Sequence, residues 1–385
     1  MSSAELPTGA TEAQSPPETR GPESPPPSPG DLALRGLPDP WNARLGLVTI
    51  AFLLVVAGIG WYLLKELAPI LRPLLLAFFL CYVILPSHYR LSRYIPRAAA
   101  DVLLAVASAG LLALLAWLLV GSATQLNDEI PQLVKRGEVL VNNAEDYVVT
   151  HLPPWLANQV EEIIRGQSQL LLWFKQVAGS LAGSAAHLFS EVILVGIYLI
   201  FLLMEAGRYP RRVQRAFPGA QSERVLTVIS NINAAMVGYL HAKVKASLFL
   251  AIPATLLLWA FGVQFALMWG VLTFLFSFIP YLGIILACSG PILLAFLQMD
   301  SFGRPALVAG LLIGIHVFAS NLIEPSLTGR AVGLSPLVIL VMLAFWGLCW
   351  GLIGMILAVP LTIMIKIILE SRPFTRPFAR LIGEE

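Results

Sequence analysis

A long uncharged stretch dominates the pattern of apolar and polar positions in the C-terminal half of the chain. The 54 residues between Lys245 and Asp300 include no Asp, Glu, Lys, Arg or His. As a single helix they would extend about 80 Å, whereas the hydrocarbon core of a bilayer is about 30 Å thick. The stretch must therefore cross a membrane more than once, or enter it and turn back.

Helix-breaking residues divide this stretch and also a second uncharged run, residues 331–365. They are Ile279-Pro280-Tyr281-Leu282-Gly283 and Gly290-Pro291 in the first, and Trp346-Gly347, Trp350-Gly351, Gly354 and Pro360 in the second. Lipid cannot bind the backbone groups that a helix break exposes, so such a break must be buried in protein or line a wet cavity. Secondary transporters use discontinuous helices in this way. The pattern therefore predicts two broken or re-entrant segments and indicates movement of a solute.

The remaining apolar runs and the composition support a membrane location. Hydrophobic residues make up 57% of the chain and charged residues 12%, against about 25% charged in soluble proteins. The pattern predicts an all-α polytopic membrane protein surrounded by membrane lipid. Separate spans are predicted at residues 45–64, 70–85, 102–120, 189–204 and 305–323.

The N-terminal 40 residues differ in kind from the rest of the chain. They include ten prolines and have too little apolar surface to offset the entropy of ordering. No apolar segment follows a basic start, so a signal peptide is not expected. We predict a disordered tail, and a polyproline ligand for another protein is the alternative.

A polar insert separates the third and fourth spans. Residues 121–190 have four basic and seven acidic side chains, and apolar positions recur at helical spacing. Two such sets are Ile130, Leu133 and Val134, and Val160, Ile163 and Ile164. We predict amphipathic helices whose apolar faces bind the same chain, the lipid interface or another subunit.

Loop charges predict the orientation of the spans. Residues 205–245 have seven basic side chains against two acidic ones, and Arg90, Arg93 and Arg97 lie between the second and third spans. Basic loops stay on the cytoplasmic side, so these segments and both termini are predicted to be cytoplasmic. The acidic insert then lies outside.

The two uncharged runs share a local pattern. Gly283-Ile284-Ile285-Leu286-Ala287 precedes Pro291, and Gly354-Met355-Ile356-Leu357-Ala358 precedes Pro360. An internal duplication would explain the match, and paired interrupted segments mark binding sites in secondary transporters. Convergent composition of two apolar segments is the explanation we favour.

Ionisable side chains are rare in the C-terminal region, and a charge at the bilayer centre costs at least about 2.5–3.5 kcal/mol. Asp300 and Arg304 lie in a short polar connection, where we expect them to be solvated. Glu324 could take up a proton or cation, with Arg330 as its partner or as a ligand for an anionic solute. The alternative is an interfacial ion pair that fixes the loop around Pro325.

Several uncharged or weakly basic residues complete the predicted pathway. Asn321 lies one turn before Glu324 and could bind solute or a neighbouring helix. His316 could relay protons, although a helix-bridging role is favoured. Tyr281 could line the path or anchor the chain at the interface. Others would act by exposing backbone: Pro280, Gly283, Pro291 and Pro360.

The region from 263 to 369 resembles the autoinducer-2 exporter family of transporters, also described as PerM-like permeases. The motifs that carry the resemblance are Phe278-Ile279-Pro280-Tyr281-Leu282-Gly283, Gly290-Pro291, Asn321-Leu322-Ile323-Glu324-Pro325, Gly329-Arg330, Gly333-Leu334-Ser335-Pro336-Leu337, Phe345-Trp346-Gly347 and Ala358-Val359-Pro360-Leu361. The resemblance implies about eight transmembrane spans, a transporter of the inner membrane and a homo-oligomer. Family members are linked to export of a signalling molecule or to sodium/proton exchange.

This sequence departs from the family pattern at two positions near the first break. Ser277 stands where the family often has Asn, and Ile284 replaces a common Pro. These departures concern the identity of the small-molecule or ion substrate. The predicted parts are a disordered Pro-rich cytoplasmic tail (1–40), three spans (41–120), an extracytoplasmic amphipathic helical insert (121–188), a fourth span with a cytoplasmic amphipathic helix (189–245), a transport core with interrupted helices (246–370) and a cytoplasmic C-terminal tail (371–385).

Three functional hypotheses follow. The first is a secondary transporter or exporter of a small solute, the second a sodium/proton antiporter centred on Glu324, and the third a scaffold that recruits partners through the tail and insert. No enzymatic activity, cofactor or metal site is expected, because the five histidines are scattered and no phosphate-binding or nucleophile motif occurs. The absence of a basic cluster argues against nucleic acid.

Overall fold

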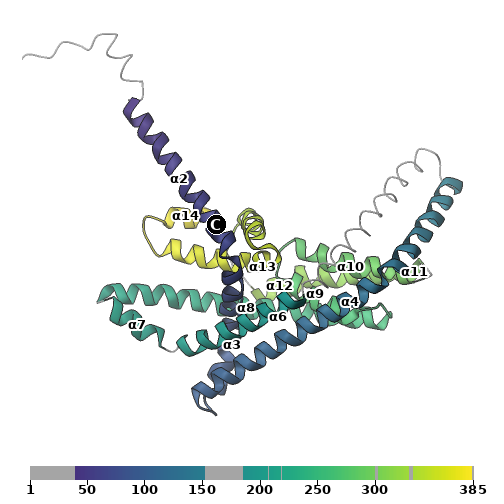
Figure 1. Ribbon diagram of the computed structural model, residues 1–385, viewed down its shortest axis with the longest axis horizontal. Helices are drawn as coiled ribbons and strands as arrows, with labels where there is room; N and C mark the ends of the chain where they lie inside the picture. Colours follow the sequence, from purple (N-terminus) through teal and green to yellow (C-terminus); the bar gives the residue numbers. More distant parts are fainter. Residues whose placement is uncertain are drawn as a thin grey trace, which may run out of the picture. The chain divides into compact units, whose positions relative to one another are not determined.

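The computed structural model is helical in the residues that it describes, which are 40–151, 185–206, 208–217, 219–299, 302–328 and 333–383. Within these ranges there is no strand, and one isolated bridge pairs Leu334 with Gly383. Most of the Pro-rich tail, the second half of the insert and Arg330 lie outside them. The helices are α2 (Pro40–Glu66), α3 (Ala68–Leu91), α4 (Arg97–His151), α6 (Ala185–Ala206), α7 (Tyr209–Ala216), α8 (Ala220–Ala260), α9 (Ala266–Phe276), α10 (Leu282–Gln298), α11 (Gly303–Phe318), the π-helix η1 (Ala319–Ile323), α12 (Glu324–Thr328), α13 (Pro336–Glu370) and α14 (Arg376–Ile382) (Figure 1).

The described helices confirm an all-α polytopic membrane protein. Six of them are long and apolar enough to cross a membrane, and a seventh span results if α6 and α7, bent by 62°, are counted together. The helices α9 and α10 are apolar but shorter, so the described residues give six or seven candidate spans where about eight were expected. The chain divides into two units, residues 1–62 and 63–385, and the packing described below lies within the second.

The first uncharged stretch is broken where Pro280 predicts it. Helix α9 ends at Phe276 and α10 begins at Leu282, so residues 277–281 form the break. The further break predicted at Gly290-Pro291 is wrong, because both residues lie inside α10. A side chain at Gly290 would overlap the Trp269 indole, so this glycine serves close packing between α9 and α10.

The second uncharged run is also interrupted, although α13 continues on both sides. Gly351 has φ 64° and ψ −141°, a conformation that favours glycine and leaves the helical region. A Cβ atom at Gly354 would overlap the carbonyl oxygen of Trp346. In a straight helix these two residues would be about 12 Å apart along the axis. The chain therefore bends sharply at Gly351, which confirms the second broken segment.

The matched glycines of the two uncharged runs have the same local environment. A Cβ atom at Gly283 would overlap the carbonyl oxygen of Phe276, in the helix before the break. Gly354 approaches the Trp346 carbonyl in the corresponding way. Thus the two segments share a backbone contact as well as a sequence pattern, as an internal duplication would predict.

The first helix of the insert packs on its own chain. Helix α4 runs for 55 residues, from the third predicted span into the insert. Its residues Leu126, Ile130 and Leu133 are buried in one apolar cluster with Trp269 of α9 and Leu294 of α10. Of the three partners considered for this apolar face, the structure supports the same chain. The second apolar set of the insert lies outside the described residues.

Helix α8 is the central element of the C-terminal half of the chain. It contacts α3, α9, α11, α12 and α13, and it is a single helix of 41 residues. The apolar part of α8 follows Lys245 and, together with the turn before it, is about as long as the hydrocarbon core of a bilayer is thick. The basic first half, with Arg224, continues beyond that length in the same helix. One rigid element therefore connects the charged segment to the broken helices.

Alanine at Gly283 or Gly354 is expected to destabilise the protein, because the added methyl group would overlap a backbone carbonyl oxygen. We expect the free energy of unfolding to fall by about 1–3 kcal/mol for each change, measured by thermal unfolding in detergent. Gly310→Ala in α11 is the control, since no atom lies within 4 Å of its Cβ position. Equal unfolding midpoints for all three variants would contradict the close approach.

Candidate functional site

A cavity of about 280 Å³ lies beside the break between α9 and α10. Its walls come from α8, from residues 277–281 with the adjoining turns of α9 and α10, and from the continuous run of α11, η1 and α12. The wall combines hydroxyl, charged, imidazole and apolar groups. The lining residues are Lys243, Leu250, Thr273, Ser277, Ile279, Pro280, Tyr281, Gly283, Ile284, Ala287, His316, Ser320 and Glu324.

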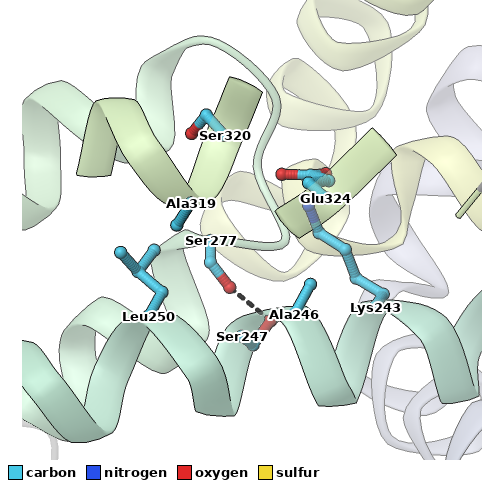
Figure 2. Close-up of a pocket in the computed structure, with 8 residues that line it drawn as sticks. All are labelled: Lys243, Ala246, Ser247, Leu250, Ser277, Ala319, Ser320 and Glu324. Carbon is cyan, nitrogen blue, oxygen red and sulfur yellow. Dashed lines mark hydrogen bonds and ion pairs between the residues drawn. The ribbon is translucent and has the colours of Figure 1, made fainter. Parts of the chain in front are cut away.

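Helix α8 supplies one face of the site. Lys243, Ser247 and Leu250 follow each other at intervals of four and three residues, which places them on the same side of a helix. All three are buried, and Lys243 is only 4% exposed. They also line a small extension of the cavity together with Ser277 and Ser320 (Figure 2).

An ion pair joins α8 to the opposite wall. The Lys243 ammonium donates a hydrogen bond to Oε1 of Glu324, which lies at the start of α12. Figure 2 shows the two side chains pointing toward each other. The Lys243 side chain is 5% exposed and that of Glu324 39%, so Lys243 is the more buried partner. A buried ammonium is unfavourable without a counter-charge. Loss of Glu324 would therefore leave a more buried charge unpaired than loss of Lys243 would.

The third wall of the cavity comes from one helical face. His316, Ser320 and Glu324 are each four residues apart, a spacing that places side chains on the same side of a helix, and all three line the cavity. The backbone between them includes the π-helix η1, in which i→i+5 hydrogen bonds widen the turn relative to an α-helix. Asn321 is exposed instead, and its side-chain amide donates to the Val317 carbonyl at 2.8 Å.

His316 lines the cavity from α11. Its ring is fully buried, and Nδ1 lies 2.9 Å from the Leu312 carbonyl oxygen. A carbonyl oxygen can only accept, so Nδ1 donates and Nε2 is an acceptor in the neutral ring. Nε2 is buried and has no hydrogen-bond partner among the described residues.

The break contributes a strained turn at the cavity. Tyr281 has φ 62° and ψ −53°, and the Leu282 N–H donates to the Pro280 carbonyl at 2.7 Å. This is the rare γ-turn with positive φ at its central residue, which is strained in any residue with a side chain. Gly283 N–H donates to the Ile279 carbonyl at 3.0 Å. Such strain occurs mainly at sites where the surrounding structure enforces it.

Hydroxyl groups tie the break to α8. The Ser277 hydroxyl binds the Ser247 hydroxyl, drawn as a dashed line in Figure 2, and it also lies 2.8 Å from the Phe274 carbonyl. Ser277 is the position where the sequence departs from the family motif. A serine therefore performs a structural role here, because it connects the broken segment to the central helix.

The structure brings together five of the predicted pathway residues. They are Pro280, Tyr281, Gly283, His316 and Glu324. Others lie elsewhere: Asn321 and Pro325 are exposed on η1 and α12, and Pro291 and Pro360 are buried inside α10 and α13 without lining the cavity. Arg330 lies outside the described residues, so its proposed pairing with Glu324 stays a prediction.

Sequence reasoning missed Lys243, Thr273 and Ser320. Lys243 was counted among the basic residues that orient the loops, because it precedes the uncharged stretch by three positions. A signal was present, since Lys243 shares a helix face with the apolar residues that follow. Ser320 could also have been found, because it lies four residues from both His316 and Glu324, which places it on their helix face.

The arrangement can bind a polar molecule. The cavity wall includes hydroxyl groups, an imidazole ring and a paired charge, beside apolar side chains of α10. No group of three or more His, Cys, Asp or Glu side chains that could hold a metal occurs in the parts of the chain that are described. These features match a binding site for a small polar solute.

Comparison with known proteins fits this arrangement. The family described as AI-2E family transporter matches residues 48–373, most of the chain. The chain belongs to the AI-2E family of transporters. The match confirms the resemblance seen in the C-terminal motifs and extends it to the first spans.

Relatives of this AI-2E family protein cover most of its length. It is 31% identical to a putative transport protein of Haemophilus influenzae, over 77% of this chain and 84% of that protein. It is 27% identical to the AI-2 transport protein TqsA of Escherichia coli, over 79% of this chain and 85% of that protein. It is 26% identical to a sodium-lithium/proton antiporter of Halobacillus andaensis, over 77% of this chain and 86% of that protein.

Glu324→Gln is expected to destabilise the protein more than Lys243→Met. The first change leaves a buried ammonium unpaired, at a cost of about 3–5 kcal/mol, whereas the second leaves a half-exposed carboxylate that water can reach. Thermal unfolding in detergent measures the difference. The double variant, which removes both charges, should recover most of the loss, and a larger loss in Lys243→Met would contradict the burial asymmetry.

Proposed function

We propose that this protein is a secondary transporter that moves a small polar solute across the cytoplasmic membrane through the cavity at the α9–α10 break. The observation that carries the proposal is the position of a polar cavity of about 280 Å³ beside interrupted backbone in a multi-pass membrane protein. Interrupted helices of transporters present backbone and helix ends to a substrate in this way. Export is the direction we propose, with both termini cytoplasmic.

The chemistry of the wall favours a solute with several hydroxyl or carbonyl groups. The hydroxyl groups of Thr273, Ser277 and Ser320 can each donate and accept a hydrogen bond. The Lys243–Glu324 pair can bind either a donor or an acceptor. The Escherichia coli relative is named as a transport protein for AI-2, so AI-2 is the first candidate solute for this chain.

Sodium/proton antiport centred on Glu324 is the second candidate function. It is favoured by the relative named as a sodium-lithium/proton antiporter and by the presence of a carboxylate in the cavity wall. The Lys243 ammonium on that carboxylate weighs against it, because a cation would compete with an ammonium already in place. Solute transport is thus the function that the site supports better. The oligomeric state stays a prediction.

Filling the cavity is expected to stop solute movement. Ala287 is buried and lines the cavity, so Ala287→Phe should block it, whereas Ile285→Phe on the same helix alters an exposed side chain that is 65% accessible. Vesicles containing each variant would be loaded with a metabolite extract that includes AI-2, and the released solutes identified by mass spectrometry. We expect at least a tenfold loss of specific release in Ala287→Phe, of the order that misplacement in a site produces.

Two results of this experiment would contradict the proposal. The first is that no solute leaves wild-type vesicles faster than it leaves vesicles without protein. The second is that Ala287→Phe releases solute as fast as Ile285→Phe does. Purified variants must first show the same helical content, so that a folding defect is not read as blocked transport.

A further inference from the structure

The Lys243–Glu324 pair determines the charge that a solute or ion meets in the cavity. The two residues are 81 positions apart and lie on facing elements, α8 and α12. Among the described residues that line the cavity, Glu324 is the one carboxylate and Lys243 the one lysine or arginine. The charged side chains of the wall therefore sum to zero while the pair is formed.

The cavity otherwise contains the ligands that a sodium ion would need. Thr273, Ser277 and Ser320 supply hydroxyl oxygens, and Glu324 supplies a carboxylate. Carboxylate, hydroxyl and carbonyl oxygens are the ligands that hard cations prefer. What distinguishes this wall from a vacant cation site is the ammonium hydrogen-bonded to the carboxylate oxygen.

We propose that the Lys243 ammonium is a resident cation at Glu324, in the place that a coupling sodium ion or proton would take. This inference rests on the proposed function, because it concerns which ions solute movement through the same cavity requires. Solute movement through the site then needs no sodium or proton gradient. The class of transport is facilitated movement down the solute's own gradient.

The geometry makes displacement of the ammonium by a free cation unfavourable. Lys243 is attached to α8 within reach of Glu324, so its effective concentration at the carboxylate is that of a tethered group. A sodium ion that displaced it would leave the ammonium of Lys243, a side chain that is 5% exposed, without its counter-charge. Removal of one partner from a buried ion pair is strongly unfavourable. At ordinary salt concentrations the Lys243 ammonium therefore stays bound to the Glu324 carboxylate, and sodium does not displace it.

The same reasoning predicts what happens when the ammonium is removed. With Lys243→Gln, the Glu324 carboxylate stays in the wall of the cavity that Thr273, Ser277 and Ser320 also line, and the ammonium no longer occupies its oxygen. The variant should then bind sodium or lithium, and the full-length protein should become more stable when either ion is present, since a ligand that binds the folded state stabilises it. Lys243→Arg keeps the positive charge and should behave like the wild type.

Thermal unfolding of the purified full-length protein in detergent tests this inference. Each form is compared in sodium or lithium chloride and in the same concentration of N-methyl-D-glucamine chloride. We expect no difference for the wild type or Lys243→Arg, and a rise in the midpoint of at least about 2 °C for Lys243→Gln in sodium or lithium. The rise should disappear in Lys243→Gln/Glu324→Gln.

Two outcomes would overturn the inference. One is a sodium- or lithium-dependent rise in the wild type that Glu324→Gln abolishes. The other is a folded Lys243→Gln protein with no such rise. If Lys243→Gln is not recovered in folded form, Lys243→Met replaces it. If neither variant is recovered, the unfolding of the wild type in sodium or lithium and in N-methyl-D-glucamine decides the outcome.

A flux measurement separates this inference from the proposed function. Wild-type vesicles that release a solute are tested with the sodium and proton gradients collapsed. A release rate within twofold of the original supports the inference, and a tenfold fall overturns it. If wild-type vesicles release no solute, the proposed function fails, whereas the ion-binding result from thermal unfolding still stands or falls by itself.

Discussion

Backbone hydrogen bonding inside a membrane is the constraint on which the C-terminal half of this protein depends. At residues 277–281 the chain leaves helical geometry, and lipid cannot supply the missing partners. Local bonds from Leu282 and Gly283 satisfy part of the break, and Ser277 binds both α8 and the end of α9. The γ-turn at Tyr281 is strained, so the packing around it must enforce it. The cavity is the space that remains beside this enforced turn.

The ion pair stabilises the other side of the same space. Lys243 projects from α8, the helix that contacts most of the region, and Glu324 follows the π-helical turn of η1. His316, Ser320 and Glu324, spaced four residues apart, lie on one wall of this space. Two departures from regular helix adjoin the cavity, the γ-turn at Tyr281 and the π-helical turn that includes Ser320. Regular helices contribute polar groups as well, since Lys243 comes from α8 and His316 from α11.

The sequence predicted the parts of this architecture that follow from composition and from helix breakers. Spans, the break at Pro280 and the bend at Gly351 are examples, because apolar length and glycine or proline act locally. It failed at Gly290-Pro291, where glycine serves packing against Trp269 and not a break. It also favoured Asn321, three residues before Glu324, over Ser320, four residues before it, although helical spacing allows either position. Lys243 was missed since a lysine near a predicted membrane boundary is ordinarily a solvated loop residue.

Water accessibility of the cavity tests the central claim most directly. Ser320 would be changed to cysteine in a chain whose Cys81, Cys288 and Cys349 are alanine, with Leu322, an exposed apolar residue of the same helix, as the matched position. Modification by a charged, membrane-impermeant thiol reagent in open membrane fragments is then measured. The account predicts modification of Ser320→Cys at least about tenfold faster than of Leu322→Cys, since the thiolate forms in water and not in lipid. Equal, slow modification at both positions would contradict it.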